Sequence, residues 1–267
     1  MDPEGMTTSE LDRAVESKRI AEGIHAVSLT DDWNTPNGTA NGGYVLGVVL
    51  HAIAQESPLH DPLSVSITYF RPPVPGDATI DVTALRIGKR VATFEAVMSQ
   101  DDKPVVHAVA SFHDAEVAGD LKHLAPAPRY PRPDDCIDVM GAVPAGSVPI
   151  LDRFDYRHES VPGWMEGKPS GDTSATFWVR FKDRRPIDAI AAAVLVDAYP
   201  PVTAEIDHLK SATVQLTVHF RRRPAAEWAL ARVVTHQVID GFHDEDVELW
   251  DEDGRLFAQS RQLAILR

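Results

Sequence analysis

The sequence predicts an α+β fold in which one unit, a long helix followed by antiparallel strands, is used twice. Two observations indicate this. Each half of the chain contains an apolar segment of helix length, followed by a strand-like run that ends in an aromatic residue and an arginine. The two copies lie about 150 residues apart when Phe70 is matched to Phe220 and the turn DDKP to the turn DEDG.

Each copy contains one candidate helix. In the first half this is the segment 42–57, GGYVLGVVLHAIAQES, and in the second it is the segment 186–199, PIDAIAAAVLVDAY. Pro186 suits the first turn of a helix because that position needs no backbone donor. We therefore expect helices over both segments, with Asp197 near the C-terminal end of the second.

The strands are expected from alternation. The runs 64–71, SVSITYFR, and 212–221, ATVQLTVHFR, alternate and are rich in β-branched residues. Further strand-like runs follow over 78–114 and 227–266, separated by turns rich in Gly, Asp and Lys. A lone copy would leave a sheet edge exposed, whereas two copies can pair their edges.

The clearest break in the chain is the segment 116–150, where prolines recur and no periodic pattern is seen. We expect an N-terminal domain over 1–115, a Pro-rich linker over 116–150 and a C-terminal domain over 151–267. The total length of 267 residues suits two domains of ordinary size.

Composition narrows the class of protein. The apolar fraction of 43% and the charged fraction of 25% are those of an ordinary globular chain. No apolar run approaches the roughly 18 to 20 residues of a membrane span, and the N-terminus lacks the basic start and apolar centre of a secretory signal. We expect a cytoplasmic protein with no membrane partner. The net charge of −14 argues against nucleic acid as a partner.

Cysteine and histidine usage excludes several kinds of chemistry. The single Cys136 cannot form an intramolecular disulfide or a Cys-based zinc site, and no histidine lies near it in the sequence to activate it as a nucleophile. The eleven histidines are scattered, and neither HExxH nor GxSxG occurs. We therefore expect no metal site, no cofactor and no serine nucleophile.

Several strings, in their order and spacing, resemble the acyl-CoA thioesterase II family and its thioesterase-like relatives. In the first half they are NGGYVLGVVLHAI, TYFRPPVPGD, LRIGKRVATFEA and KPVVHAVASF. In the second they are FWVRFKDRRPIDAIAAAVLVDAY, ATVQLTVHFRRRPAAEW and LWDEDGRLFAQSRQLAIL. The resemblance covers the chain from about residue 20 onward. It implies a double hot-dog fold, an acyl-CoA substrate and hydrolysis of its thioester. A homo-oligomer, such as a dimer of double hot-dog chains, is also expected.

The resemblance also implies a set of site residues. In that family an aspartate on the second helix, a threonine at the start of the next strand and a glutamine on the last strand hold the attacking water. The matching positions are Asp197, Thr213 and Gln262. Thr217 lies four residues further along the same strand and is the aligned residue if a bulge intervenes. The asparagine that follows the aspartate in the family is replaced here by Ala198-Tyr199.

The chemistry of Asp197 can be argued from its position alone. Helical spacing places it on the apolar face with Ile190 and Val194, near a helix C-terminus where negative charge is disfavoured. Burial there raises a carboxyl pKa toward the range of a general base. The alternative is a structural Asp that accepts hydrogen bonds from backbone amides or pairs with a cation such as Lys210.

The neutral candidates depend on which way their strands face. Alternation places Thr213 with Gln215, Thr217 and His219, and Gln262 with Ser260 and Ala264. Hydroxyl and amide groups of this kind can orient a water molecule but cannot ionise it. If these faces meet the helix, Thr213 and Gln262 reach the site. If they meet solvent, both are surface residues.

Further candidates would bind other parts of the substrate. The turn Asn41-Gly42-Gly43-Tyr44 opens a helix whose N–H groups could stabilise an oxyanion, with Gly43 the preferred donor and Gly42 beside it; a simple helix start is the alternative. Arg71, Arg90 and Arg221 are candidates for binding CoA. They are otherwise solvated surface charges.

Two other functions remain open. A non-catalytic protein of the same fold could bind or sense acyl-CoA, and the sequence barely separates it from the enzyme. A hot-dog hydratase is less favoured, because no histidine follows Asp197 until His208.

Overall fold

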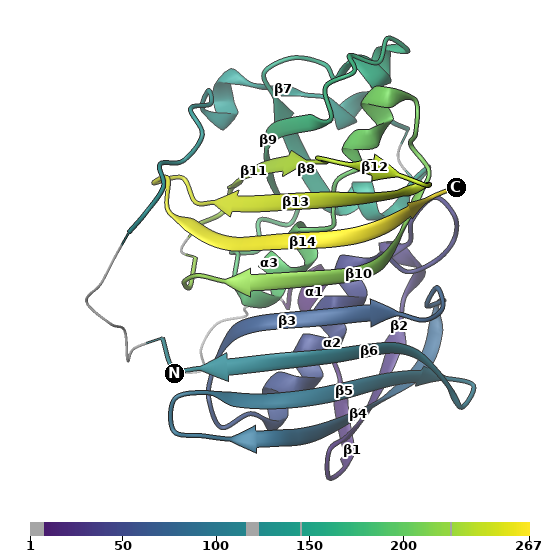
Figure 1. Cartoon of the computed structure of the whole chain (residues 1–267), viewed down its shortest axis with the longest axis vertical. Helices are drawn as coiled ribbons and strands as arrows, with labels where there is room; N and C mark the ends of the chain where they lie inside the picture. Colours follow the sequence, from purple (N-terminus) through teal and green to yellow (C-terminus); the bar gives the residue numbers. More distant parts are fainter. Residues whose placement is uncertain (1–7, 116–122, 145, 225) are drawn as a thin grey trace.

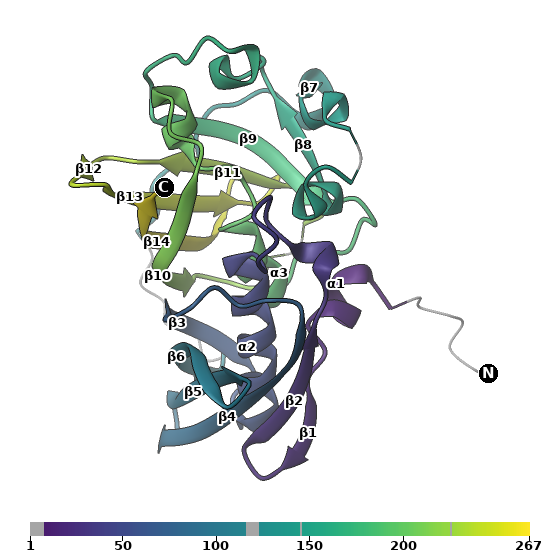
Figure 2. The ribbon, with the colours of Figure 1, turned by 90° about the vertical axis from the view of Figure 1, so that its right-hand side faces the viewer.

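The chain forms one continuous antiparallel sheet around two helices, α2 (Gly42–Glu56) and α3 (Ala189–Leu195). The structure is a computed structural model that describes residues 8–115, 123–144, 146–224 and 226–267. In these ranges the sheet has 14 strands (Figure 1), and it curves around both helices (Figure 2). A helix wrapped by a sheet therefore occurs twice, which confirms the predicted α+β, double hot-dog architecture.

The strand order shows the repeat directly. The first unit runs in space as β1 (Lys18–Ala21), β2 (Ile24–Leu29), β4 (Gly76–Ile87), β5 (Ala92–Gln100), β6 (Lys103–His113) and β3 (Asp61–Tyr69). The second continues as β10 (Ser211–Phe220), β14 (Leu256–Leu266), β13 (Phe242–Trp250), β11 (Ala229–Val234), β9 (Ser174–Phe181), β8 (Phe154–His158) and β7 (Ile137–Asp138), with β12 (Val238–Ile239) paired to β13. The two orders mirror one another about the middle of the sheet.

Short helical segments connect these strands. They are the one-turn helix α1 (Glu10–Ala14) and the 3-10 segments η1 (Asp31–Trp33), η2 (Pro133–Asp135), η3 (Met140–Ala142), η4 (Pro149–Arg153), η5 (Gly163–Glu166) and η6 (Val202–Ile206). None of the helices in the described ranges has the length and apolar content needed to cross a membrane.

The two units join through β3 and β10. These strands pair antiparallel, with Thr68 opposite Gln215 and Val65 opposite Val218. Each strand would otherwise be an exposed edge, so the pairing satisfies backbone groups of both units. This confirms the expectation that the two copies pair their edges.

Helix α2 is buried almost all round, as expected of a central helix. Asn41 caps its N-terminus, because the Asn41 side-chain oxygen accepts a hydrogen bond from the Tyr44 backbone N–H at 3.0 Å. The helix ends at Glu56, after which Ser57 is extended. The observed bounds agree with the predicted 42–57 to within one residue.

Helix α3 is shorter than the sequence predicts. It begins after Asp188, whose side chain accepts a hydrogen bond from the Ala191 N–H, so Pro186 lies outside the helix. It ends at Leu195, ahead of Pro200 and Pro201, which cannot continue a helix. The predicted helix over 186–199 is therefore wrong at both ends, and Asp197 lies in the turn that follows α3.

The predicted linker has more structure than its composition indicates. Its described residues include η2, β7, η3 and the start of η4, and β7 pairs with β8. Trp178 Nε1 donates a hydrogen bond to the Pro131 carbonyl oxygen at 2.7 Å. Residues 123–144 thus pack in part against the second unit. The domain limits at 115 and 151 remain predictions.

Candidate active site

Asp197 lies where the C-terminal end of α3 meets the N-terminus of α2. Its Oδ2 accepts hydrogen bonds from the Gly43 backbone N–H at 2.8 Å and from the Asn41 side-chain amide at 3.0 Å. The same Asn41 nitrogen also donates to the Asp197 carbonyl oxygen at 2.8 Å. These contacts join residues from the two halves of the chain. They match the structural role considered for Asp197, but with the amides of another helix as donors.

Glycines allow this close approach of the two helices. A Cβ atom on Gly43 would lie 2.6 Å from the Val194 carbonyl oxygen and 2.9 Å from the Asp197 Cβ. On Gly42 it would lie 2.8 Å from the Asp197 Oδ2. Contacts this short essentially do not occur for real Cβ atoms, so the helix packing requires a glycine at 43, and a Cβ on residue 42 would displace the Asp197 carboxylate.

Burial and hydrogen bonding act on the Asp197 carboxyl in opposite directions. Removal from water raises its pKa from 3.8 to about 6, although the Gly43 N–H, the Asn41 side chain and the Gly42 backbone all favour the charged form. In the described part of the chain, no lysine or arginine lies within ion-pair distance of Asp197, so the alternative pairing with Lys210 is not seen. The net result is a carboxyl with a raised pKa of about 6.

The other Asp197 carboxyl oxygen is available. Among the described residues, Oδ1 has no hydrogen-bond partner, and it is not one of the unpartnered polar atoms that are sealed from solvent. One oxygen is therefore held by the protein while the other can meet a water molecule.

Tyr69 closes one side of this junction. Its hydroxyl donates a hydrogen bond to the Gly42 carbonyl oxygen at 2.7 Å. Burial, with a contribution from the nearby Asp197 charge, raises the pKa of the Tyr69 hydroxyl well above its usual range. Tyr69 therefore stays neutral and fixes the backbone at the start of α2.

A β-bulge decides the orientation of Thr213. The register of β10 on β14 shifts between Thr213 and Gln215, so Thr213 lies opposite the buried Ala264. Its hydroxyl donates to Gln262 Oε1 at 3.1 Å. The bulge reverses the simple alternation, and Thr213 faces the interior while Gln215 faces out.

Thr217 lies on the other face of β10. Its hydroxyl hydrogen-bonds to the Ser66 hydroxyl at 3.0 Å, and it lines a groove on the outer surface of the sheet. The expected grouping of Thr213 with Thr217 is therefore wrong, whereas Gln262 faces inward with Ser260 and Ala264, all three being buried. Of the two threonines, only Thr213 reaches Gln262.

Residues 29–113 match the family model of the acyl-CoA thioesterase N-terminal domain, and residues 133–266 match that of the acyl-CoA thioesterase C-terminal domain. This chain belongs to the acyl-CoA thioesterase family. The two matched segments correspond to the two structural units, in the same order. The resemblance noted in the sequence is thereby confirmed.

Solved structures and curated proteins also resemble this chain over nearly its whole length. A Thermobifida fusca structure provisionally named thioesterase II is 28% identical, with a TM-score of 0.88 and coverage of 98% of this chain and 100% of that one. An acyl-CoA thioesterase II from Mycobacterium marinum is 19% identical, with a TM-score of 0.75 and coverage of 96% and 98%, and supports the fold alone. An uncharacterised protein of Mycobacterium tuberculosis is 25% identical over 93% of this chain and 91% of its own length.

The candidate site contains residues that the sequence interpretation missed. Asn41 contacts Asp197 from across the domain interface, although the family's asparagine after the aspartate is absent. Its position directly before a helix was the only signal, and that signal indicates a cap. Glu245 is buried beside Gln262, and its Oε1 accepts a hydrogen bond from Gln262 Nε2 at 3.2 Å. Glu245 shares strand parity with Val247 and Leu249, which marks it as an inward-facing acid.

The three arginines predicted to bind CoA in this thioesterase-family chain do not form one cluster. Arg71 follows the end of β3 and donates to the Pro104 carbonyl oxygen at 2.7 Å. Arg221 follows the end of β10, where Nε donates to Gln259 Oε1 at 2.9 Å. Because β3 and β10 are antiparallel, these two arginines lie at opposite ends of the pair. Arg90 is exposed in the turn between β4 and β5. A role in CoA binding remains a prediction for each.

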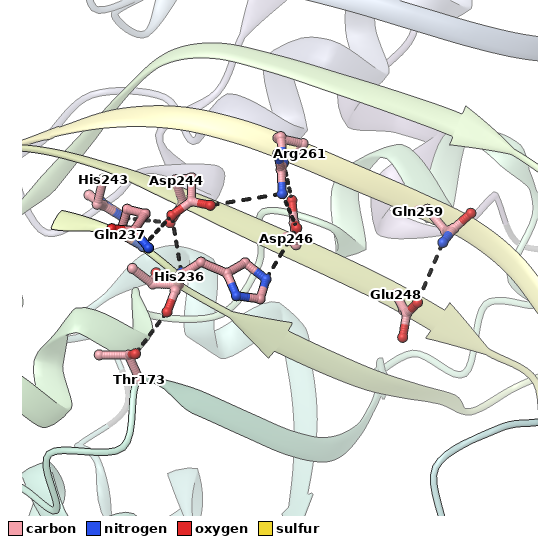
Figure 3. Close-up of polar contacts among 10 residues, drawn as sticks. Thr173, His236, Gln237, His243, Asp244, Asp246, Glu248, Gln259 and Arg261 are labelled. Atoms are coloured by element: carbon pink, nitrogen blue, oxygen red, sulfur yellow. Dashed lines mark hydrogen bonds and ion pairs between the residues drawn. The ribbon is translucent and has the colours of Figure 1, made fainter. Parts of the chain in front are cut away.

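The outer face of the second unit is dense in charge. Figure 3 shows Arg261 between Asp244 and Asp246 on β14 and β13, with Arg261 Nε 2.6 Å from Asp246 Oδ1. On the same strands Gln259 lies opposite Glu248 and donates to it at 3.4 Å. These pairs point away from α3, so they belong to a different surface from Asp197.

Proposed function

We propose that this chain hydrolyses the thioester of a fatty or related acyl-CoA to the free acid and CoA, with water activated by Asp197. The observation that carries the proposal is a carboxyl with a pKa of about 6, held at the junction of α2 and α3 with one oxygen open. A general base works best when its pKa lies near the working pH. Membership of the acyl-CoA thioesterase family supports the substrate class.

The proposed reaction uses the free carboxyl oxygen. Asp197 Oδ1 takes a proton from water while the water oxygen bonds to the thioester carbonyl carbon. The resulting tetrahedral intermediate collapses, the carbon–sulfur bond breaks, and the proton held by Asp197 passes to the departing sulfur. The products are the carboxylic acid and the CoA thiol, and the carboxylate is restored.

In this proposal, Thr213 and Gln262 orient the attacking water molecule. Both are neutral and face the interior of the sheet, and the 3.1 Å hydrogen bond between them fixes their relative position. The Thr213 hydroxyl donates to Gln262, which leaves its oxygen free to accept a hydrogen bond from water. Orientation of a well-placed nucleophile can account for as much as about 7 to 11 kcal/mol of a barrier.

In this proposal, backbone N–H groups at the start of α2 stabilise the oxyanion of the tetrahedral intermediate. The Gly43 N–H donates to Asp197 Oδ2 in this structure, so this donor is already engaged. Protonation of the carboxyl during the reaction removes the charge that attracts this N–H, at the moment when charge appears on the substrate oxygen. The same amide, with that of Gly42 beside it, can then stabilise the oxyanion.

The decisive experiment replaces Asp197 by an isosteric residue that is not a base. Asp197→Asn retains an acceptor for the Gly43 N–H, so the fold should persist while thiol release from decanoyl-CoA falls at least about 1,000-fold. Asp240→Asn is the control, because Asp240 is an exposed turn residue with a positive φ of 52° that asparagine also adopts. Turnover of Asp197→Asn within a few fold of wild type would place the base elsewhere.

The engaged Gly43 N–H also favours a second candidate, a non-catalytic acyl-CoA binding protein. In that case the Asp197 carboxyl only caps α2, as the two hydrogen bonds to Oδ2 would allow. Calorimetry with decanoyl-CoA, combined with a thiol assay on the same sample, separates the two. Tight binding with no thiol released by the wild-type chain would establish the binding protein instead.

A further inference from the structure

Glu245 is a buried acid that the proposed reaction does not use. It lies on the inward face of β13 and is 5% exposed. Its two carboxyl oxygens have different partners: Oε1 accepts from Gln262 Nε2 at 3.2 Å, and Oε2 accepts from the Val202 backbone N–H at 3.2 Å. A buried carboxyl is costly to desolvate, so a position of this kind calls for a specific role.

The first of these contacts determines how the Gln262 amide is turned. An amide side chain has an acceptor end and a donor end that can exchange by a half-turn. Here Glu245 Oε1 accepts from the donor end of the amide, so Gln262 Oε1 is left facing Thr213. The opposite orientation would turn the Gln262 oxygen toward Glu245 and would remove the acceptor for the Thr213 hydroxyl.

The second contact reaches the connection that carries Asp197. Val202 begins η6, five residues after Asp197, and its N–H is held by Glu245. One carboxyl therefore ties β14, through Gln262, to the segment between α3 and η6. Through these two contacts, Glu245 constrains the positions of Gln262, of Thr213 bonded to it, and of Asp197.

The surroundings of Glu245 disfavour its ionisation. Burial, with contributions from the nearby carboxylates of Asp197 and Asp244, raises the pKa of Glu245 to about 8, against the effect of the Val202 and Gln262 hydrogen bonds. Tyr199 also faces Glu245 closely enough for the two to interact electrostatically. At neutral pH Glu245 therefore adds little negative charge beside Asp197.

We propose that Glu245 is a positioning residue of the thioesterase site, which fixes the orientation of the Gln262 amide toward Thr213 and the placement of the Asp197 connection. An effect of Glu245 on catalysis rests on the proposed function. The orientation of Gln262 itself does not depend on turnover.

The chain contains a matched control for this inference. Glu248 lies on the same strand and faces Gln259 on β14, so the two strands carry the same Glu–Gln pairing on their outer face (Figure 3). Glu245→Leu should lower kcat for decanoyl-CoA at least about 30-fold with KM changed less than about threefold, because misplacement of a water-orienting group acts on the chemical step. Glu248→Leu should leave both constants near wild type.

Rescue and an independent readout complete the test. Glu245→Gln retains an acceptor for Gln262 but sets an NH2 group against the Val202 N–H, so kcat should recover in part and lie between the values of Glu245→Leu and wild type. In NMR spectra, the Gln262 side-chain NH2 signals, identified by their loss in Gln262→Ala, should be protected from exchange in wild type and lose that protection in Glu245→Leu.

The outcomes are distinguishable. Unchanged kcat and unchanged Gln262 signals in a folded Glu245→Leu chain would overturn the positioning role. A wild-type chain that releases no thiol would refute the proposed function. The Gln262 signals would then still decide whether Glu245 orients that amide, and melting curves of each variant separate this from a loss of folding.

Discussion

The Gly43 backbone N–H and the Asp197 carboxylate are joined by a 2.8 Å hydrogen bond, although the two residues are 154 positions apart in the sequence. The bond connects the N-terminus of one central helix to the turn that follows the other. A helix N-terminus favours negative charge, so this contact holds the carboxylate in place despite its burial. The candidate site thus lies at the interface between the two units, and neither unit contains all of its residues.

Gly43→Ala should disrupt this interface. The added Cβ would lie 2.6 Å from the Val194 carbonyl oxygen, and backbone cannot easily move away. We expect a loss of unfolding free energy on the order of 2 to 4 kcal/mol in urea titrations, together with loss of thiol release. Gly47→Ala is the graded control, because its Cβ would meet the Val194 Cγ2 at 3.0 Å, and a side-chain methyl can shift. Equal stability of the two variants would contradict this account of the helix contact.

The two threonines of β10 give a test of the bulge. Thr213→Val removes the hydroxyl that donates to Gln262 and keeps the β-branched shape, so kcat should fall about 10- to 100-fold while the strand is preserved. Thr217→Val makes the same chemical change on the outer face, and thiol release should stay close to wild type. If Thr217→Val lowered kcat and Thr213→Val did not, the proposed role of Thr213 in the reaction would be wrong.

The rate of thiol release should depend on pH through Asp197. A base must be ionised to accept a proton, and the pKa of Asp197 is raised to about 6. We expect kcat/KM to rise with pH up to about 6 and to level off above it. A disulfide reagent that reports thiols at acidic pH makes the profile measurable. The residual activity of Asp197→Asn should show no such rise, and a wild-type midpoint near 4 would argue for an ordinary exposed carboxylate.

The stability of the fold should also depend on pH through the same carboxyl. Its folded pKa, about 6, lies above the reference value of 3.8. The contribution of this carboxyl to the free energy of unfolding is therefore retained below about pH 4 and is lost as the pH rises through 6. The free energy of unfolding of Asp197→Asn, relative to that of wild type, should therefore increase by on the order of 3 kcal/mol between about pH 4 and pH 7. Urea titrations of both chains across this range provide the measurement. A stability difference that does not vary with pH would mean that Asp197 titrates normally in the folded state.

The sequence by itself determined the elements and their repetition. Local periodicity predicted α2 to within one residue and located β3 and β10, because alternation and helical spacing are properties of neighbouring residues. The repeated order of these elements, with the family strings, predicted the double hot-dog fold. The resemblance named Asp197 and Gln262 as candidates, but the sequence left open whether Gln262 faces the helix or solvent. The end of α3 was predicted too late, because the helix ends at Leu195, ahead of Pro200 and Pro201, which cannot continue it.

Only the tertiary structure decided how the candidate site is assembled. The bulge that turns Thr213 inward is a matter of register between β10 and β14, and one residue of register reverses a strand face. Asn41 and Glu245 join the site through contacts across 156 and 17 positions, and no local pattern encodes contacts of that kind. The desolvation that raises the pKa values of Asp197 and Glu245 arises only when the chain folds. A sequence can name such residues, but their pKa values follow from the solvent that folding removes.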